Sequence, residues 1–364
     1  MHFLLNDRNS YPIDESMMSG YGCYSISKYF EIHENGDVSL CCFSWLPKFF
    51  GNILTDSPKQ ILHNSERFKV LHDMDNGSFT ECTDHCPYIN SFLSGNYVKN
   101  SHIVPLTQLR YEKKRRPIIV NFSYDRSCNL QCPSCRSELI LHKLGSNSKL
   151  DKLHQSAIEF VNYLIDQGNE VIVKITGSGD AFASPTYWKY IKELSNGVDN
   201  NLRLRLHTNG LLMTKERMLE IEPLWKNIQH LNVSIDAATP ETYSIVRKNG
   251  SFDKIKLNID SLDELLTDYQ FSNLVSFMTN FTVQKTNYKE VINFLKWQLS
   301  YRNIKNVYFS MVEQWGHISA EQYKSEYLLS DSELLELKQL LQDPIFNDSR
   351  VILGNLSMVR NLNE

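Results

Sequence analysis

Apolar runs of strand length alternate with amphipathic segments from about residue 118 to residue 315. In each amphipathic segment, apolar residues recur at the spacing of one helix face. The pattern predicts strands over Ile118–Ser123, Val171–Thr176, Leu202–His207, Leu231–Ile235, Val275–Val283 and Val307–Met311. It predicts helices over Leu153–Gln167, Pro185–Leu194, Lys215–Trp225, Phe252–Leu266 and Lys289–Leu299, and one more that opens at Thr239 and Pro240.

Strand–helix units in succession predict an α/β fold built on a parallel sheet with right-handed crossovers. We expect a partial (β/α)6 TIM-like barrel, with a small cysteine-rich region attached to it. The expected divisions are residues 1–112 for the cysteine-rich region, 113–315 for the barrel and 316–364 for a helical closure, whose clearest helix spans 329–341. In such sheets, functional residues lie at the carboxyl ends of the strands.

The length and net charge of the chain limit its number of domains and its binding partners. The chain has 364 residues, 41% of them hydrophobic, and a formal net charge of −4. This length suits one large domain or two moderate ones, and the charge argues against nucleic acid as a partner. The basic run 110–116 is interpreted as a solvated linker between domains.

The sequence predicts a cytoplasmic protein without a membrane partner. No stretch approaches 18 consecutive apolar residues, and the first residues lack the pattern of a signal peptide. Eight cysteines in a cytoplasmic chain are more often metal ligands than disulfide partners.

Three of these cysteines, Cys128, Cys132 and Cys135, follow the first predicted strand with C-x3-C-x2-C spacing. Three thiolates on one loop can hold three irons of a cubane cluster and leave the fourth iron open. Zinc sites usually pair one C-x2-C with a second such pair or with histidines, and ferredoxin loops use other spacings. Three thiols on one short loop cannot all reach good disulfide partners. The spacing favours a site-differentiated 4Fe-4S cluster, with a structural metal site as the alternative.

This loop resembles the cluster loop of the radical S-adenosylmethionine (SAM) superfamily. The loop after the second predicted strand, Gly177-Ser178-Gly179-Asp180, resembles the Gly-Gly-Glu-Pro segment with which that superfamily grips the SAM amino group. In this comparison, backbone carbonyls and the charge of Asp180 would meet the ammonium group.

The ends of the third and fourth predicted strands also resemble the corresponding segments of the superfamily. His207-Thr-Asn209-Gly closes the third strand, and the run that contains Ser234 and Asp236 closes the fourth. The resemblance implies that Asn209 belongs to the cofactor pocket, that Ser234 and Asp236 face the carboxylate and ribose of SAM, and that Arg247 is a cation for the carboxylate.

Two further residues and one departure complete the comparison. Gln284 and Asn287, after the fifth strand, are expected to point toward the same pocket. The residue before the last loop cysteine is usually aromatic in the superfamily, but here it is Ser134. That departure puts the adenine contact in doubt, and leaves the cluster prediction unchanged.

The remaining cysteines lie in the N-terminal part of the chain: Cys23, Cys41, Cys42, Cys82 and Cys86. The segment resembles the SPASM or twitch modules that carry auxiliary 4Fe-4S clusters, with Cys23, Gly36 and Cys41 fitting their opening pattern. Gly36 has the signature of a type I′ hairpin. In most relatives this module follows the barrel, whereas here it largely precedes it.

The resemblance implies one auxiliary cluster, held by Cys23, Cys41, Cys82 and Cys86. Cys42 is then spare, and its use in place of Cys41 is an alternative, as is a zinc site.

The resemblance also implies a function. SAM would be cleaved reductively to a 5′-deoxyadenosyl radical, which abstracts a hydrogen atom from a substrate C–H bond. An external electron donor of the flavodoxin or ferredoxin type is expected. The preferred substrate is a peptide or protein, modified by crosslinking, epimerisation or oxidation.

Other functions remain open. One alternative is a dehydrogenase or epimerase of a sugar, an aminoglycoside or another small molecule. A second, of a different class, is a non-catalytic zinc or iron–sulfur scaffold. The catalytic acid or hydrogen donor is unassigned; the candidates near strand ends are Tyr124, Asp125, His207 and Glu313.

Overall fold

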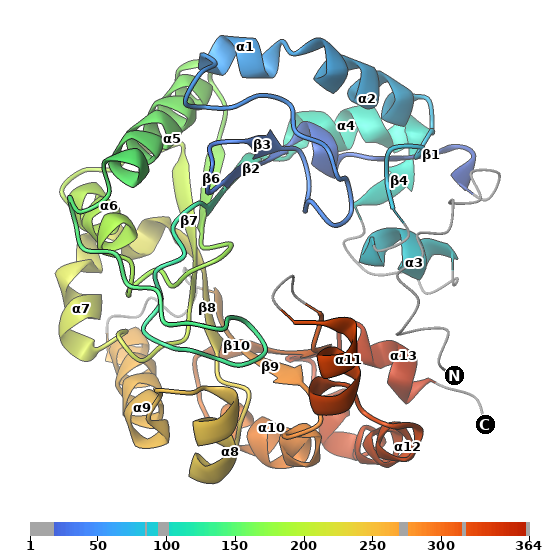
Figure 1. Ribbon diagram of the computed structural model, residues 1–364, viewed down its shortest axis with the longest axis vertical. Helices are drawn as coiled ribbons and strands as arrows, with labels where there is room; N and C mark the ends of the chain where they lie inside the picture. The colour runs from blue at the N-terminus through green and yellow to red at the C-terminus, as the bar shows by residue number, and fades with distance from the viewer. Residues whose placement is uncertain (1–17, 84–85, 94–101, 269–275, 315–317, 362–364) are drawn as a thin grey trace. The chain divides into compact units, whose positions relative to one another are not determined.

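The computed structural model describes residues 18–83, 86–93, 102–268, 276–314 and 318–361 (Figure 1). It divides into two compact units. The first comprises Met1–Asp125, Gly145–Ser178 and Asp199–Arg203, and the second comprises Arg126–Leu144, Gly179–Val198 and Leu204–Glu364.

The first unit contains a small antiparallel sheet and a part of the parallel sheet. In the small sheet, β1 (Tyr21–Cys23) pairs with β4 (Ile103–Pro105). In the other sheet the order is β3 (Val38–Ser39), β2 (Tyr29–His33), β5 (Ile118–Ser123) and β6 (Val171–Ile175). The helices of this unit are α1 (Pro58–Leu62), α2 (Ser65–Asp75), α3 (Pro87–Leu93), α4 (Leu106–Arg115) and α5 (Ser148–Asp166).

Strand β2, which the sequence analysis did not predict, extends the sheet beyond β5. It pairs with β5 in parallel, with Glu31 opposite Asn121, and with β3 in antiparallel orientation. A hairpin connects β2 and β3 at Gly36 as expected, but it is not the predicted type I′ turn, which needs positive φ at both Asn35 and Gly36. Only Gly36 is left-handed, with φ of 94°, and its N–H donates to His33 O at 2.9 Å. The hairpin returns the chain toward Cys41.

Burial alternates along β2, whereas β5 is buried at nearly every position. Phe30 and Phe122 are fully buried, and the ring of Phe30 contacts that of Phe160 on α5, with centroids 5.2 Å apart. The guanidinium of Arg67 lies 5.4 Å from the Phe30 ring. Helix α5 and strand β2 therefore share one apolar core.

The second unit holds parallel strands in the order β7 (Leu202–Thr208), β8 (Ile228–Ser234), β9 (Ser276–Val283), β10 (Ile304–Met311) and β11 (Val351–Ile352). Its helices are α6 (Pro185–Ser195), α7 (Lys215–Glu220), α8 (Pro240–Val246), α9 (Phe252–Asp268), α10 (Val291–Leu299), α11 (Ala320–Gln322), α12 (Asp331–Leu340) and α13 (Leu356–Arg360). Thr239 caps α8 and Ser330 caps α12 through side-chain oxygens, as their sequences indicate.

The α/β fold with a parallel sheet is confirmed, and it is consistent with the partial barrel. The predicted helix 215–225 is too long: α7 ends at Glu220, and a 3-10 helix, Glu222–Asn227, follows because Pro223 supplies no N–H for an α-helical bond. The C-terminal region also adds a strand, β11, that was not predicted. Val275 and Gly316 lie outside the described residues, and the domain boundaries remain a prediction.

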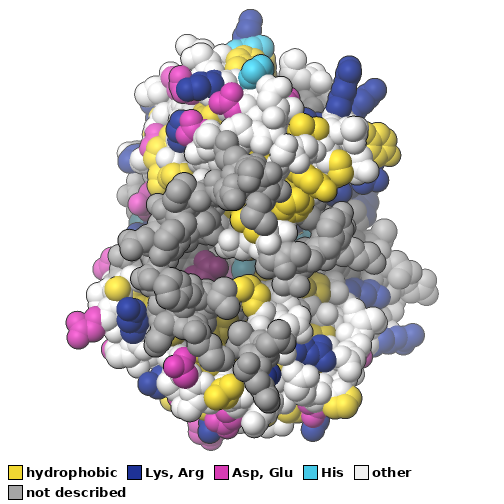
Figure 2. Space-filling view, turned by 90° about the vertical axis from the view of Figure 1, so that its right-hand side faces the viewer, with side chains coloured by type: hydrophobic (Ala, Val, Ile, Leu, Met, Phe, Trp, Pro, Cys, Tyr) yellow, Lys and Arg dark blue, Asp and Glu magenta, His cyan; other side chains and the backbone are white. Residues whose placement is uncertain are grey.

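The basic run belongs mainly to α4 and is therefore not an irregular linker. On the face shown in Figure 2, basic and acidic side chains are interspersed. Among the described helices, none combines the length and apolar character needed to cross a membrane.

We predict that Phe160→Ala lowers the free energy of unfolding by about 3–5 kcal/mol, because it removes a fully buried ring from the core between α5 and β2. Urea unfolding followed by circular dichroism measures the change. Phe68→Ala is the control, since Phe68 is 48% exposed. Equal losses in the two variants would contradict the shared core.

Candidate active site and metal centres

The C-x3-C-x2-C loop lies in the second unit, and backbone hydrogen bonds hold it at several points. Cys128 N donates to Ile140 O at 2.8 Å, and Gln131 N donates to Lys248 O at 3.1 Å. Cys128 and Cys132 are buried, whereas Cys135 is exposed. The loop thus has a defined shape before any ligand is considered.

Each thiol of the loop has its own nitrogen donor. Cys128 Sγ accepts from Leu130 N at 3.4 Å and from Asn209 Nδ2 at 3.6 Å. Arg247 donates to Cys132 Sγ at 3.7 Å, and Arg136 donates to Cys135 Sγ at 3.9 Å. Such donors stabilise sulfur in its thiolate form, and hydrogen bonds to cluster sulfurs tune reduction potentials.

Arg136 is a site residue that the sequence analysis missed. Its guanidinium is buried and also donates to Arg126 O at 2.7 Å, which joins the beginning of the loop to its last cysteine. The only signal in the sequence is its place directly after Cys135. Burial raises the pKa of Cys128 to about 12, and the neighbouring Asp180 adds to the shift. A metal must therefore displace a proton from this thiol.

Asp180 is a buried carboxylate that is already hydrogen-bonded inside the second unit. One oxygen accepts from Phe182 N and Ala183 N, each at 2.9 Å. The other accepts from Thr208 Oγ1 at 2.9 Å and Asn209 N at 2.7 Å. Burial raises its pKa, and these donors oppose the rise. The carboxylate thus ties the loop after β6 to the end of β7.

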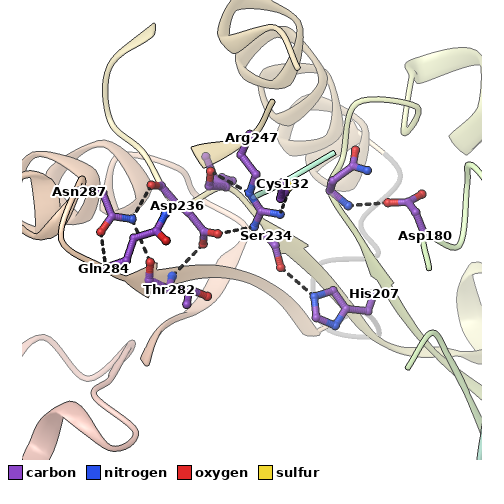
Figure 3. Close-up of polar contacts among 11 residues, drawn as sticks. Cys132, Asp180, His207, Ser234, Asp236, Arg247, Thr282, Gln284 and Asn287 are labelled. Carbon is purple, nitrogen blue, oxygen red and sulfur yellow. Dashed lines mark hydrogen bonds and ion pairs between the residues drawn. The ribbon is translucent and has the colours of Figure 1, made fainter. Parts of the chain in front are cut away.

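Asp236 and Arg247 form a buried ion pair, with 2.6 Å between Oδ2 and Nη2 (Figure 3). Thr282 N donates to the other oxygen of Asp236 at 2.7 Å. Burial pushes the pKa of Asp236 upward, while the guanidinium and the amide oppose it; the 2.6 Å contact is that of an ionised pair. Arg247 thus joins the end of β8 to Cys132.

Asp236 adopts a left-handed backbone, with φ of 62°. Asn287 Nδ2 stabilises that turn by donating to Asp236 O at 2.9 Å. Such a conformation costs free energy in a non-glycine residue, and surrounding contacts must compensate for it. The hydrogen bond from Asn287 therefore helps to hold this turn at the end of β8 in its left-handed conformation.

Two more predicted residues lie at neighbouring strand ends (Figure 3). Ser234 Oγ and His207 Nε2 are 2.7 Å apart, so the imidazole of this catalytic candidate interacts with a proposed SAM-contacting serine. Gln284 is buried, and its Oε1 has no hydrogen-bond partner in the described residues. A buried acceptor without a partner is expected to meet a ligand or a water.

In the first unit, Gly177 lies against β5. Its N–H donates to Phe122 O at 3.0 Å, and Ser178 Oγ donates to Ser123 O at 2.8 Å. A Cβ atom on Gly177 would lie 1.6 Å from Ser123 Oγ. Only glycine therefore fits at this position.

The other catalytic candidates are less suggestive. Tyr124 Oη lies 2.7 Å from His154 Nδ1 on α5. Asp125 is fully buried, and Glu313 is exposed after β10. Their positions do not assign a catalytic acid or hydrogen donor.

Four of the five N-terminal thiols line one cavity of the first unit. These are Cys23, Cys41, Cys82 and Cys86, and Cys42 is not among the lining residues. Trp45, Phe79, Tyr88, His102 and Ile103 contribute to the wall. Burial raises the pKa of each of the four thiols, that of Cys23 to about 12, and the neighbouring thiols add to the shift.

A single zinc ion would require its thiolate ligands to lie close together. Zinc–sulfur bonds are about 2.3 Å long, so thiolates on one zinc ion lie within ~4.6 Å of one another. Among the residues that the structure describes, no three histidine, cysteine or acidic side chains converge on a point that could hold a single metal ion. None of the cysteines is in a disulfide.

The amino-acid sequence matches two family models. Residues 123–297 match the radical SAM superfamily, and residues 23–87 match SPASM, an iron-sulfur cluster-binding domain. Residues 123–297 of this chain form a radical SAM domain. The SPASM segment precedes the radical SAM segment, as predicted. SAM and a 4Fe-4S cluster are the cofactors that the radical SAM domain implies, and the SPASM domain implies auxiliary iron–sulfur binding.

Two curated proteins are similar to this radical SAM chain. The AdoMet-dependent heme synthase of Methanosarcina barkeri (strain Fusaro / DSM 804) is 27% identical over 176 residues, which is 48% of this chain and 45% of that protein. The GTP 3′,8-cyclase of Peptoclostridium acidaminophilum is 27% identical over 143 residues, which is 39% of this chain and 41% of that protein. The chain thus spans less than half the length of either relative.

Solved structures with a similar chain course include HydG, a maturase of the [FeFe]-hydrogenase, and a mutant of spore photoproduct lyase. HydG has a TM-score of 0.41 and 13% identity, covering 70% of this chain and 57% of HydG. The lyase has a TM-score of 0.36 and 13% identity, covering 67% of this chain and 83% of the lyase.

We predict that Gly177→Ala weakens SAM binding and lowers the free energy of unfolding by about 1–3 kcal/mol, because the added methyl group overlaps Ser123. Equilibrium dialysis with SAM and thermal unfolding test the two effects. Gly197→Ala is the matched control, since a Cβ atom there meets nothing within 4 Å. If both variants behave like the wild type, the tight packing at Gly177 is refuted.

Proposed function

We propose that this chain is a radical SAM enzyme that modifies a peptide or protein. The supporting observation is the loop whose three thiols each face a nitrogen donor, beside the Asp236–Arg247 pair in the same unit. When bound, the cluster supplies the electron that cleaves SAM into methionine and a 5′-deoxyadenosyl radical, which takes a hydrogen atom from a substrate C–H bond.

In this proposal, Cys128, Cys132 and Cys135 hold the site-differentiated cluster. Arg136 and Asn209 orient and stabilise the thiolates through the contacts described above. The fit rests on the chemistry of the donor set, because thiolates are the usual ligands of iron–sulfur clusters.

We assign the SAM contacts in two groups. Gly177, Ser178 and Gly179 offer backbone groups to the SAM amino group. Ser234, Asp236 and Arg247 offer the polar contacts for its carboxylate and ribose. Since both oxygens of Asp180 are engaged, we propose that Asp180 positions the loop and Asn209, and that its charge acts on SAM from a distance.

For the auxiliary site, we propose that Cys23, Cys41, Cys82 and Cys86 hold one 4Fe-4S cluster. The cavity lined by these four thiols supports the set. Such a centre can accept the electron that remains on a substrate after hydrogen abstraction, and it can also shape the substrate pocket.

A small-molecule substrate is the second candidate, because the two curated relatives carry the names of a heme synthase and a GTP cyclase. In that case the reaction is a dehydrogenation or epimerisation of a sugar, an aminoglycoside or another small molecule. An electron donor of the flavodoxin or ferredoxin type serves either candidate, and a cytoplasmic location remains a prediction.

A triple replacement separates the enzyme from a metal scaffold. After anaerobic reconstitution, we expect about eight irons per wild-type chain and about four in Cys128→Ala/Cys132→Ala/Cys135→Ala, because the auxiliary site remains. With dithionite and SAM, the wild type should form 5′-deoxyadenosine and the triple variant none. Stoichiometric zinc in the wild type, with no deoxyadenosine, would refute the proposed function.

Single replacements test the auxiliary ligands. Cys41→Ala should lose about four irons and the matching electron paramagnetic resonance signal, because a four-iron cluster loses one of its thiolates. Cys42→Ala should keep both, because Cys42 does not line the cavity. If Cys42→Ala loses the cluster and Cys41→Ala keeps it, Cys42 is the ligand and Cys41 is the spare cysteine.

A further inference from the structure

Helix α4 carries an exposed basic face that the proposed chemistry does not use. Arg110, Lys114 and Arg115 are exposed, and Tyr111 is 63% exposed. Leu109, on the opposite side of the helix, is buried in a small core with Tyr24 and Val104. The helix is therefore amphipathic, with its basic side outward.

The ion pairs on α4 leave positive charge unbalanced. Lys113 pairs with Asp75, and Arg116 pairs with Glu112 at 2.8 Å. Arg115 also lies 3.4 Å from Glu112, so two guanidinium groups share one carboxylate. Arg110 and Lys114 have no acidic partner within the described part of the chain.

Arg110 and Lys114 stand four residues apart and are therefore neighbours on the helix surface. Like charges at this spacing destabilise a helix by a few tenths of a kcal/mol. The chain as a whole has a net charge of −4. A positive face on a net acidic chain is a candidate for recognition by a partner with the opposite charge.

This face is close to the auxiliary cysteines. Leu109 contacts β1 so tightly that a Cβ atom on Gly22 would lie 2.7 Å from Leu109 Cδ2, and the next residue of β1 is Cys23. The exposed face thus belongs to a helix that packs directly against β1, the strand that carries Cys23.

Aromatic rings connect the cavity to the end of α4. Tyr88 and His102, which line the cavity, stack with centroids 4.0 Å apart, and His102 lies 5.3 Å from Tyr24. The guanidinium of Arg116 lies 4.9 Å from the Tyr24 ring. A continuous packed path therefore leads from the auxiliary cavity to the basic helix.

We propose that the exposed face of α4 docks a small acidic one-electron carrier of the flavodoxin type, which exchanges an electron with the auxiliary centre. This proposal rests on the proposed function, because it needs a redox-active centre at the four thiols. In the exchange, the auxiliary centre, reduced by the electron left on the substrate, would lose that electron, and a flavodoxin semiquinone would gain it to become the hydroquinone.

The test compares flavodoxin binding to two variants of the reconstituted full chain. Arg110→Gln/Lys114→Gln removes two positive charges from the docking face. Lys226→Gln/Lys254→Gln removes two exposed positive charges elsewhere and is the matched control. Isothermal titration calorimetry at 50 mM and 200 mM salt gives the dissociation constants, and stopped-flow mixing of the pre-reduced chain with flavodoxin semiquinone gives the electron-transfer rate.

We expect the α4 variant to raise the dissociation constant about tenfold at low salt and to weaken its salt dependence, since opposite charges across an interface mainly set association rate and salt response. The control should match the wild type. The α4 variant should not be less stable, because it loses a like-charge pair. Equal binding in all three proteins, or a preference for an acidic peptide over flavodoxin, overturns the proposal.

An assay with dithionite distinguishes failure of the α4 docking proposal from failure of the proposed function. Dithionite needs no docking face, so wild type and α4 variant should form 5′-deoxyadenosine at the same rate with it. Deoxyadenosine without charge-dependent flavodoxin binding refutes only the docking face. Absence of deoxyadenosine in every protein refutes the function itself.

Discussion

A thiolate buried away from water is costly unless positive charge or hydrogen-bond donors compensate for it, and both cysteine sites are organised around this constraint. In the second unit, Arg136, Arg247 and Asn209 approach the loop sulfurs. In the first unit, four thiols share one cavity, and burial raises the pKa of each. The two sites meet this cost with different donors: side chains of the same unit donate to each of the loop sulfurs, whereas backbone groups of Ser25, Ile26, Tyr88 and Ile89 donate to Cys23 and Cys86 in the N-terminal cavity.

Two buried carboxylates organise the strand ends around the loop. Asp180 accepts hydrogen bonds from four donors and thereby joins the end of β7 to the loop after β6. Asp236 holds Arg247, which in turn reaches Cys132. Because each carboxylate is satisfied within its surroundings, loops that would otherwise be free to move are fixed before a ligand arrives. This preorganisation is what a site needs if it is to bind a cofactor in one geometry.

Much of this arrangement could be predicted from the sequence, because local patterns determine it. The strand ends, the caps Thr239 and Ser330 and the cysteine spacings are all local signals. The pairing of β2 with β5 could not be predicted, since about ninety residues separate partners such as Glu31 and Asn121. The hydrogen bonds of Asp180 and the place of Arg136 also depend on tertiary contacts. The family resemblance singled out Asp180, and the structure adds that both of its carboxylate oxygens already accept hydrogen bonds.

Strand β2 makes the N-terminal segment part of the parallel sheet. It lies in the N-terminal cysteine-rich segment, yet it covers the hydrogen-bonding edge of β5, the first strand of the predicted barrel. A chain without its N-terminal segment would expose that edge, together with the apolar ring of Phe122. Open strand edges of this kind template intermolecular pairing and aggregation. Deleting the N-terminal module would therefore remove a strand of the sheet as well as the cysteine-rich segment.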